Sequence, residues 1–244
     1  MDALIKLGDH MGKQWKAAGK TAKADKKGRI FTKLAREIAV AAKMGGPDPD
    51  ANPRLSLAIS AARSQSCPKD TIERAIKRGA GLTGEDINYE DTVYEGYGPH
   101  QVAVIVECQT DNKNRTFSDI RTIFAKKKGN LGASGSVAWM FDRVSYFEAE
   151  KAEVEDAEED AIEVGANEVE HSEGSSYDFY GEPNDLGAIR EALVARGWDV
   201  KTAELSYKPK NFTELNEEQL SEVHEFLAAL DDNDDTARIS ASIK

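Results

Sequence analysis

Hydrophobic residues follow two different periods along the chain, and the change falls near residue 80. Before that point, apolar side chains recur every three or four positions, which is the spacing of one helical face. Glycine and proline separate the helical stretches, since glycine tolerates the left-handed end of a helix and proline can begin the next one. The predicted helices run from about Arg29 to Met44, from Asn52 to a break at Ser66–Pro68, and from there to Gly79.

Beyond residue 80 the pattern changes to short β-rich runs. Residues 92–97 and 102–108 are predicted strands, and the second is apolar enough to lie in the centre of a sheet. Asn112 offers the cap of a following helix, and residues 135–148 are predicted to form a hairpin that turns at Asp142-Arg143. Strands on either side of a helix in this order indicate a split βαβ, ferredoxin-like sheet.

A second unit of similar content follows. It begins with a highly acidic stretch, which is predicted to be a helix with a solvated face. The predicted elements are the acidic helix 148–163, strands 168–171, 177–180 and 200–207, a helix 184–196, and finally a helix 216–230 and a strand 235–242. The pattern therefore predicts a helical region followed by two α+β units.

Charge is distributed unevenly along the 244 residues. The formal net charge is −12, yet residues 1–80 carry 17 Lys and Arg against 8 Asp and Glu. Within this basic part, the stretch from Lys13 to Arg36 holds nine cations and one acid, Asp25. A chain that is acidic overall but concentrates cations in one segment is expected to bind a polyanion through that segment. The alternative is a solvated, partly frayed helix without a partner.

The cations of this segment recur at helical spacing, and Gly28 is predicted to divide the segment into two helices or to act as a hinge. One row consists of Lys13, Lys16, Lys20, Lys23 and Lys27, and the other of Lys26, Arg29, Lys33 and Arg36. Trp15 and Phe31 lie among them, where exposed rings would stack on unpaired bases; the alternative, for Phe31 and also for Trp15, is that the ring packs in the helical core. The predicted nucleic-acid-binding residues are Lys13, Trp15, Lys16, Lys20, Lys23, Lys26, Lys27, Arg29 and Lys33. The lysines at 126–128 either extend this footprint or complement the end of their own helix.

Little in the sequence supports catalysis. The four histidines are dispersed, and neither Cys67 nor Cys108 has the context of a nucleophile. The glycine-rich segment 129–135 leads from a helix into a strand, the reverse of a phosphate-binding loop, so it is predicted to be a tight turn. The acidic run 148–163 lacks the loop spacing of a calcium site. We therefore expect no enzyme activity, catalytic residue, metal, cofactor or small-molecule substrate.

The sequence also bears on the compartment. No apolar run approaches the ~20 residues of a membrane span, and the first ten residues lack the apolar core of a secretory signal. Two cysteines without a C-x-x-C pattern suit a reducing environment. We therefore expect a cytoplasmic protein without a membrane partner, and a monomer is favoured over an oligomer.

Several long motifs resemble the YebC/PmpR family. They cover about residues 11–141, and the rest of the chain follows the family in general layout. The motifs are Gly45-Gly46-Pro47-Asp48-Pro49-Asp50-Ala51-Asn52-Pro53-Arg54-Leu55, Pro68–Gly79, Tyr94-Glu95-Gly96-Tyr97-Gly98-Pro99, Gly129–Gly132 and Gly135–Phe141. The resemblance implies an α+β multi-domain fold, in which an N-terminal all-helical domain is followed by two ferredoxin-like α+β domains, the third inserted into the second. The domains expected on this basis are residues 1–80, 81–134 plus 208–244, and 135–207.

The resemblance also implies a regulatory role. Bacterial members are described as DNA-binding transcriptional regulators, mitochondrial relatives act as translational activators, and ribosome-linked roles have been proposed for bacterial members. The first hypothesis is therefore a non-enzymatic, DNA-binding transcriptional regulatory protein that acts through the basic helical domain. The alternative is an RNA- or ribosome-associated translation factor. No recognition helix with base-reading residues stands out, so contacts to phosphate are expected to dominate.

Overall fold

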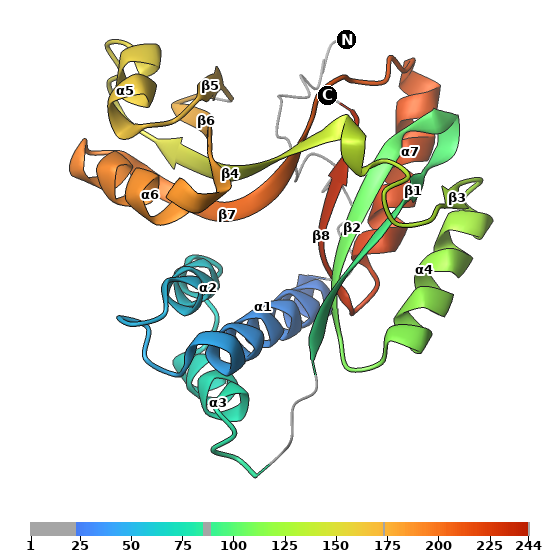
Figure 1. Cartoon of the computed structure of the whole chain (residues 1–244), viewed down its shortest axis with the longest axis horizontal. Helices are drawn as coiled ribbons and strands as arrows, with labels where there is room; N and C mark the ends of the chain where they lie inside the picture. Colours follow the sequence, from blue (N-terminus) through green and yellow to red (C-terminus); the bar gives the residue numbers. More distant parts are fainter. Residues whose placement is uncertain (1–22, 85–88, 173, 244) are drawn as a thin grey trace. The chain divides into compact units, whose positions relative to one another are not determined.

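The computed structural model describes residues 23–84, 89–172 and 174–243, which belong to two compact units (Figure 1). The larger unit contains the amino-terminal helices and a four-stranded sheet, called sheet A below. The smaller unit, Phe141–Lys210, contains a second four-stranded sheet, called sheet B. All strands of sheet B come between the third and the last strand of sheet A in the sequence, so the smaller unit is inserted into the larger one.

Three helices begin the larger unit: α1 (Lys23–Gly45), α2 (Pro53–Ser64) and α3 (Lys69–Gly79). Their common core contains Ile38, Leu55 and Ile72, which are the apolar positions at helical spacing. α1 and α3 approach closely at Gly79, where there is no room for a side chain: an added Cβ would lie 2.2 Å from the carbonyl oxygen of Ala39. The predicted all-helical region is therefore present.

The turn between α1 and α2 is fixed by Asn52. Its buried side-chain amide donates to the carbonyls of Ala41 and Gly46, and its oxygen accepts from the backbone N–H of Leu55. This last bond caps α2, and Pro53 occupies the first helical position. The predicted start of the second helix is confirmed.

α1 is continuous through Gly28, so the predicted division into two helices there is wrong, and a hinge at Gly28 stays a prediction. Glycine inside a helix lowers its stability by about 1 kcal/mol relative to alanine. A helix of 23 residues that packs against two others tolerates one such position. Among the described residues, no atom lies within 4 Å of a Cβ added at Gly28, so packing does not require glycine here.

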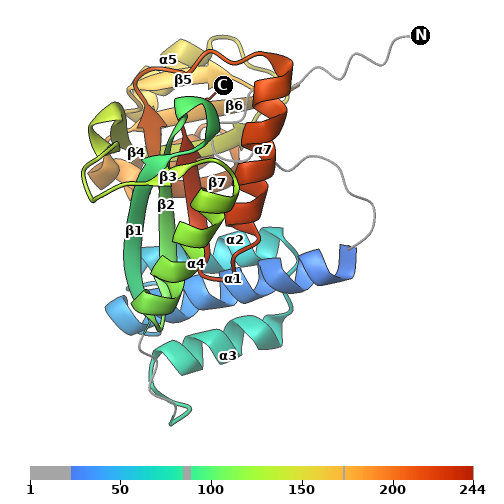
Figure 2. The ribbon, with the colours of Figure 1, turned by 90° about the vertical axis from the view of Figure 1, so that its right-hand side faces the viewer.

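Sheet A has the order β3-β1-β2-β8, and all neighbouring strands are antiparallel. Its strands are β1 (Glu90–Tyr97), β2 (Ala103–Thr110), β3 (Asn130–Leu131) and β8 (Thr236–Ala241). β2 is central and mostly buried, as its apolar run predicts, and β3 lies within the segment predicted to be a tight turn. Helices α4 (Lys113–Lys126) and α7 (Glu217–Asp231) pack against each other (Figure 2), where Phe124 and Phe226 meet edge to face.

Sheet B has the order β5-β6-β4-β7 and the βαββαβ connectivity of a ferredoxin-like fold. Its elements are β4 (Phe141–Glu150), α5 (Ala157–Val164), β5 (Glu168–His171), β6 (Ser176–Gly181), α6 (Leu186–Ala195) and β7 (Asp199–Pro209). Its core contains Phe147, Phe179 and Trp198. Single-turn 3-10 helices at Pro99–Gln101, Ala138–Met140 and Pro183–Asp185 complete the described elements. The predicted class, a helical region followed by two α+β parts with the last one inserted, is confirmed.

The hairpin predicted at residues 135–148 is absent. β4 is a single strand that begins at Phe141, and a loop with a 3-10 helix precedes it. The loop is held by the carboxylate of Glu95, which is 6% exposed and accepts from the backbone N–H groups of Gly135, Val137 and Ala138. These long-range hydrogen bonds override the strand propensity of the apolar segment.

The acidic stretch 148–163 is only partly helical, so the prediction of one long helix is wrong. β4 continues to Glu150, because Phe147 and Ala149 alternate with acids at the two-residue period of a strand. α5 begins at Ala157, and Asp156 caps it by accepting from the backbone N–H groups of two following residues. Elsewhere the predicted strands and helices lie within a few residues of the observed ones.

Candidate nucleic-acid interface

The predicted nucleic-acid-binding residues fall into three groups. Lys13, Trp15, Lys16 and Lys20 lie outside the described residues. Lys23, Lys26 and Lys27 belong to the first turns of α1. Arg29 and Lys33 follow on the same helix, and their side chains are described. The fold thus brings the last five residues of the set onto one helix.

Arg29 and Lys33 have partners within the protein. An acidic turn, residues 231–235, leads from the end of α7 to β8 and reads Asp-Asp-Asn-Asp-Asp. Nη1 of Arg29 lies 2.9 Å from Oδ1 of Asp232, and Nζ of Lys33 lies 3.0 Å from Oδ1 of Asp231. One turn further along α1, Nη1 of Arg36 lies 2.9 Å from Oδ1 of Asp235. Three cations at helical spacing therefore face the acidic turn.

Burial increases along this row of ion pairs. The exposed fractions of the side chains are 52% and 74% for Arg29 and Asp232, 20% and 31% for Lys33 and Asp231, and 12% and 5% for Arg36 and Asp235. An exposed pair stabilises a protein by about 0–1 kcal/mol because water and salt screen it. Removal of one partner of a buried pair is far more destabilising, since the other charge is left without compensation. The buried pair of Arg36 with Asp235 therefore binds the acidic turn to α1 strongly, and the exposed pair of Arg29 with Asp232 binds it weakly.

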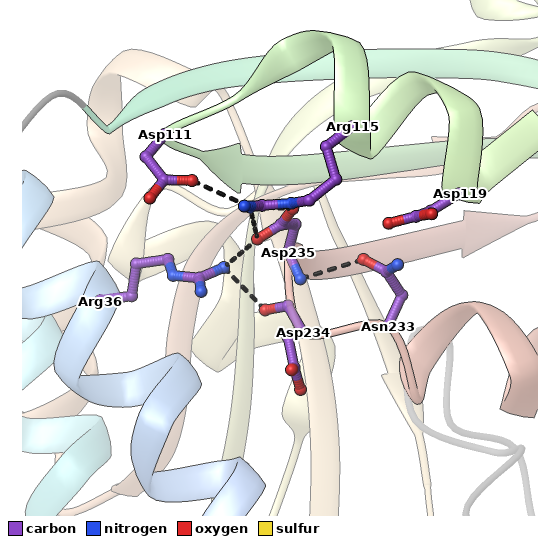
Figure 3. A pocket seen from close by; sticks show the side chains of 7 residues that line it. All are labelled: Arg36, Asp111, Arg115, Asp119, Asn233, Asp234 and Asp235. Carbon is purple, nitrogen blue, oxygen red and sulfur yellow. Dashed lines mark hydrogen bonds and ion pairs between the residues drawn. The ribbon is translucent and has the colours of Figure 1, made fainter.

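Asp235 is the centre of a polar cluster (Figure 3). Its carboxylate accepts hydrogen bonds from Arg36, Arg115, Thr110 and Thr116. Burial by itself raises the pKa of Asp235, but the hydroxyl and guanidinium donors and the two positive charges together lower it. The carboxylate is therefore ionised at neutral pH, and it joins α1 to the end of β2 and the start of α4.

The cluster borders a hollow of about 430 Å³. Its walls carry four carboxylates and two guanidinium groups: Asp111, Asp119, Asp234 and Asp235, with Arg36 and Arg115; Asn233 completes the lining. This balance of charge disfavours an anion. Among the described residues, no group of three or more His, Cys, Asp or Glu side chains is placed to hold a metal ion. Residues that line the hollow therefore join α1 to sheet A through hydrogen bonds and ion pairs, such as those of Arg36 with Gln109 and Asp235.

The sequence alone did not predict that the acidic turn pairs with α1. The signal in the sequence is a run of aspartates between a predicted helix and a predicted strand. The pairing itself joins residues as far as 203 positions apart, so it depends on how distant elements pack. Arg36 stands in the second cationic row but not among the predicted contacts, and it has the most buried acidic partner.

Contacts decide one alternative left open by the sequence, that for Phe31, whereas Lys127 and Lys128 have partners that neither of their alternatives included. Phe31 packs, partly buried, against the core of the three helices, which confirms the packing alternative for this residue. Lys127 and Lys128 pair with Glu225 and Glu222 of α7 at 3.1 Å and 3.2 Å. These lysines therefore fasten α4 to α7. Among the described residues, no helix has the length and apolar character needed to cross a membrane.

Fold and site together define a class: α+β proteins with a basic helical region in front of two antiparallel sheets, one inserted into the other. Two family models match the chain. The TACO1/YebC protein N-terminal domain matches residues 12–82, and the TACO1/YebC second and third domain matches residues 89–243. The chain belongs to the TACO1/YebC family, and the resemblance read from its motifs is confirmed.

Similar proteins cover almost the whole chain. "Probable transcriptional regulatory protein Bd1964" of Bdellovibrio bacteriovorus is 61% identical over 233 residues, which are 96% of this chain and 100% of that protein. A "Probable transcriptional regulatory protein" of Polaromonas sp. is 51% identical over 235 residues, 94% of this chain and 98% of that protein. The crystal structure of a conserved hypothetical protein, Aq1575 from Aquifex aeolicus, has a TM-score of 0.84 at 40% identity, and the match covers 95% of this chain and 96% of that one.

Proposed function

We propose that this protein is a non-enzymatic, nucleic-acid-binding regulator, and specifically a DNA-binding transcriptional regulatory protein that acts through its basic helical domain. The observation that carries the proposal is the segregation of charge: residues 13–36 hold nine cations and one acid in a chain of net charge −12. The names of the relatives support a role in transcriptional regulation. The acidic remainder repels a polyanion, so the complex forms through this end of the molecule.

The proposed contacts run mainly from lysine to phosphate. They comprise Lys13, Trp15, Lys16, Lys20, Lys23, Lys26 and Lys27, followed by Arg29 and Lys33, which already have carboxylate partners. Phosphate contacts give affinity and position without reading base sequence. Binding is therefore expected to depend steeply on salt and weakly on sequence.

A salt titration of the full chain with duplex DNA tests this proposal. If about six lysines neutralise phosphates, the log–log plot of affinity against salt has a slope of about −5. Lys23→Gln with Lys27→Gln should make the slope shallower by about 1.8, because each phosphate contact contributes about 0.9. The matched control is Arg143→Gln with Lys210→Gln, two exposed cations of the inserted unit, which should leave the slope unchanged. A slope near zero for the wild type, or the same loss in both double variants, would contradict the proposal.

The same titration separates the alternative, an RNA- or ribosome-associated factor. Single-stranded and structured RNA of equal charge replace the duplex, at the same salt concentrations. Tighter binding to RNA, or co-sedimentation with ribosomal particles at moderate salt, would favour a translation factor over a transcriptional regulator.

A further inference from the structure

We propose that the acidic turn, residues 231–235, occupies a phosphate-binding row on α1 and competes with nucleic acid for Arg29 and Lys33. The inference rests on the proposed function and names a regulation of that site. It concerns the part of the basic segment whose side chains have partners on the acidic turn.

The acidic turn presents to α1 the same chemistry as a nucleic-acid backbone. Arg29 and Lys33 lie four positions apart, so their side chains project from one side of the helix. Each is met by a carboxylate oxygen at 2.9 Å or 3.0 Å, from Asp232 and Asp231. Carboxylate and phosphate oxygens accept the same charge-assisted hydrogen bonds from guanidinium and ammonium groups. A phosphate can therefore replace either carboxylate without any change in the cation.

The gradient of burial makes the outermost pair, Arg29 with Asp232, the most exchangeable, whereas Lys33 is mostly buried and also donates to the backbone carbonyl of Asp231. Arg29 and Asp232 are both more than half exposed, so water and salt weaken their attraction. At the inner end, Asp235 is buried and is also held by Arg115 and Thr116. The inner pair therefore keeps the turn attached to α1 while Arg29, the outermost cation, changes partner first.

This arrangement predicts that the aspartates lower the affinity for nucleic acid. While Asp232 holds Arg29, that guanidinium releases no counterion from DNA, so Arg29 is only a partial phosphate contact in the wild type. Once the carboxylate is removed, Arg29 becomes a full phosphate contact. A purely structural ion pair predicts the reverse: a less stable protein whose affinity for DNA is equal or lower.

The test compares two neighbouring variants of the full chain in a salt titration with duplex DNA. Asp232→Asn removes the negative charge that pairs with Arg29 and leaves a neutral amide in its place. Asp234→Asn removes the same charge from the same turn, and the bond between this residue and Arg36 uses the backbone carbonyl, which the variant keeps (Figure 3). We expect Asp232→Asn to raise the affinity several-fold at low salt and to steepen the slope by up to about 0.9. Asp234→Asn should leave the slope unchanged.

A third variant links the gain to Arg29. In the Asp232→Asn background, Arg29→Gln should abolish both the gain in affinity and the steeper slope, and thermal unfolding confirms that all variants are folded. No gain in Asp232→Asn, or the same change of slope in Asp234→Asn, overturns the competition while wild-type binding leaves the proposed function intact. Failure of both the wild type and Asp232→Asn to bind nucleic acid overturns the proposed function as well.

Discussion

Two buried carboxylates, Glu95 and Asp235, each fix a loop of the larger unit. Glu95 accepts from three backbone N–H groups of the loop before β4, and Asp235 accepts from side chains of α1, β2 and α4. Burial raises the pKa of each carboxyl, but the hydrogen-bond donors outweigh it and the pKa of both is lowered. Both groups therefore stabilise the fold in their ionised form.

Glu95→Gln tests this role for the first of them. The amide keeps one acceptor oxygen but turns an NH₂ group toward backbone donors, so we expect the free energy of unfolding to fall by about 1–3 kcal/mol at pH 7. Urea unfolding measures the change. Glu153→Gln, at an exposed position in the inserted unit, is the control and should change the free energy little. A loss of the same size in both variants would show that the loop does not depend on the Glu95 carboxylate.

The pH dependence of this difference follows from the lowered pKa of Glu95. The unfolded chain binds protons to this group at higher pH than the folded chain does, so its contribution to stability is complete above the unfolded pKa of about 4.3. The contribution is lost as pH falls through the folded pKa. We expect the difference between wild type and Glu95→Gln to be constant from pH 7 to about pH 5 and to shrink below about pH 4, as measured by urea unfolding at each pH. A difference that grows on acidification would contradict the lowered pKa.

At the scale of elements, the continuity of α1 through Gly28 leads to a direct test. Gly28→Ala should stabilise the protein by about 0.5–1 kcal/mol, because alanine restricts the unfolded chain and the space around position 28 is open. Gly79→Ala is the contrasting variant: its Cβ would meet the Ala39 carbonyl oxygen, so we expect a lower Tm. Differential scanning calorimetry measures both. A Gly28→Ala variant that unfolds at a lower temperature, or binds DNA more weakly, would instead indicate a hinge.

Local signals in the sequence identify most helices and strands. Where a prediction from these signals is wrong, a long-range contact explains the difference. Asn52, Asn112 and Asn216 are each followed by a helix whose first N–H groups they cap, so these starts are visible in the sequence. The loop before β4 depends on Glu95, a residue in another strand, and no local pattern contains that dependence. The candidate site likewise has one part that local sequence predicts and one part that it does not. The cations of α1 are visible as a charge pattern, whereas their pairing with the acidic turn requires the packed fold.

At the scale of the whole molecule, the inserted unit accounts for the net charge. Residues 141–210 carry seven Lys or Arg and nineteen Asp or Glu, a net charge of −12, which equals that of the entire chain. The rest of the chain is formally neutral and contains the basic segment. The insertion is therefore a strongly acidic unit placed in the sequence between elements of a formally neutral remainder, and its own net charge disfavours binding of a polyanion to that unit.

Deletion of the inserted unit tests both its independence and its electrostatic effect. Phe141 and Pro209 are opposite each other in the pairing of β4 with β7, so the two connections to the insertion are within about 5.5 Å of each other at this point. A short Gly-Ser linker in place of residues 141–209 should leave sheet A and the three helices folded, as measured by circular dichroism and a single urea transition.

We expect the shortened protein to bind duplex DNA more tightly with the same salt slope, because the phosphate contacts are unchanged while the repulsive field is gone. A full-length variant with Glu153→Gln and Glu155→Gln should shift affinity in the same direction by a smaller amount. Loss of binding in a folded deletion variant would instead assign part of the interface to the inserted unit.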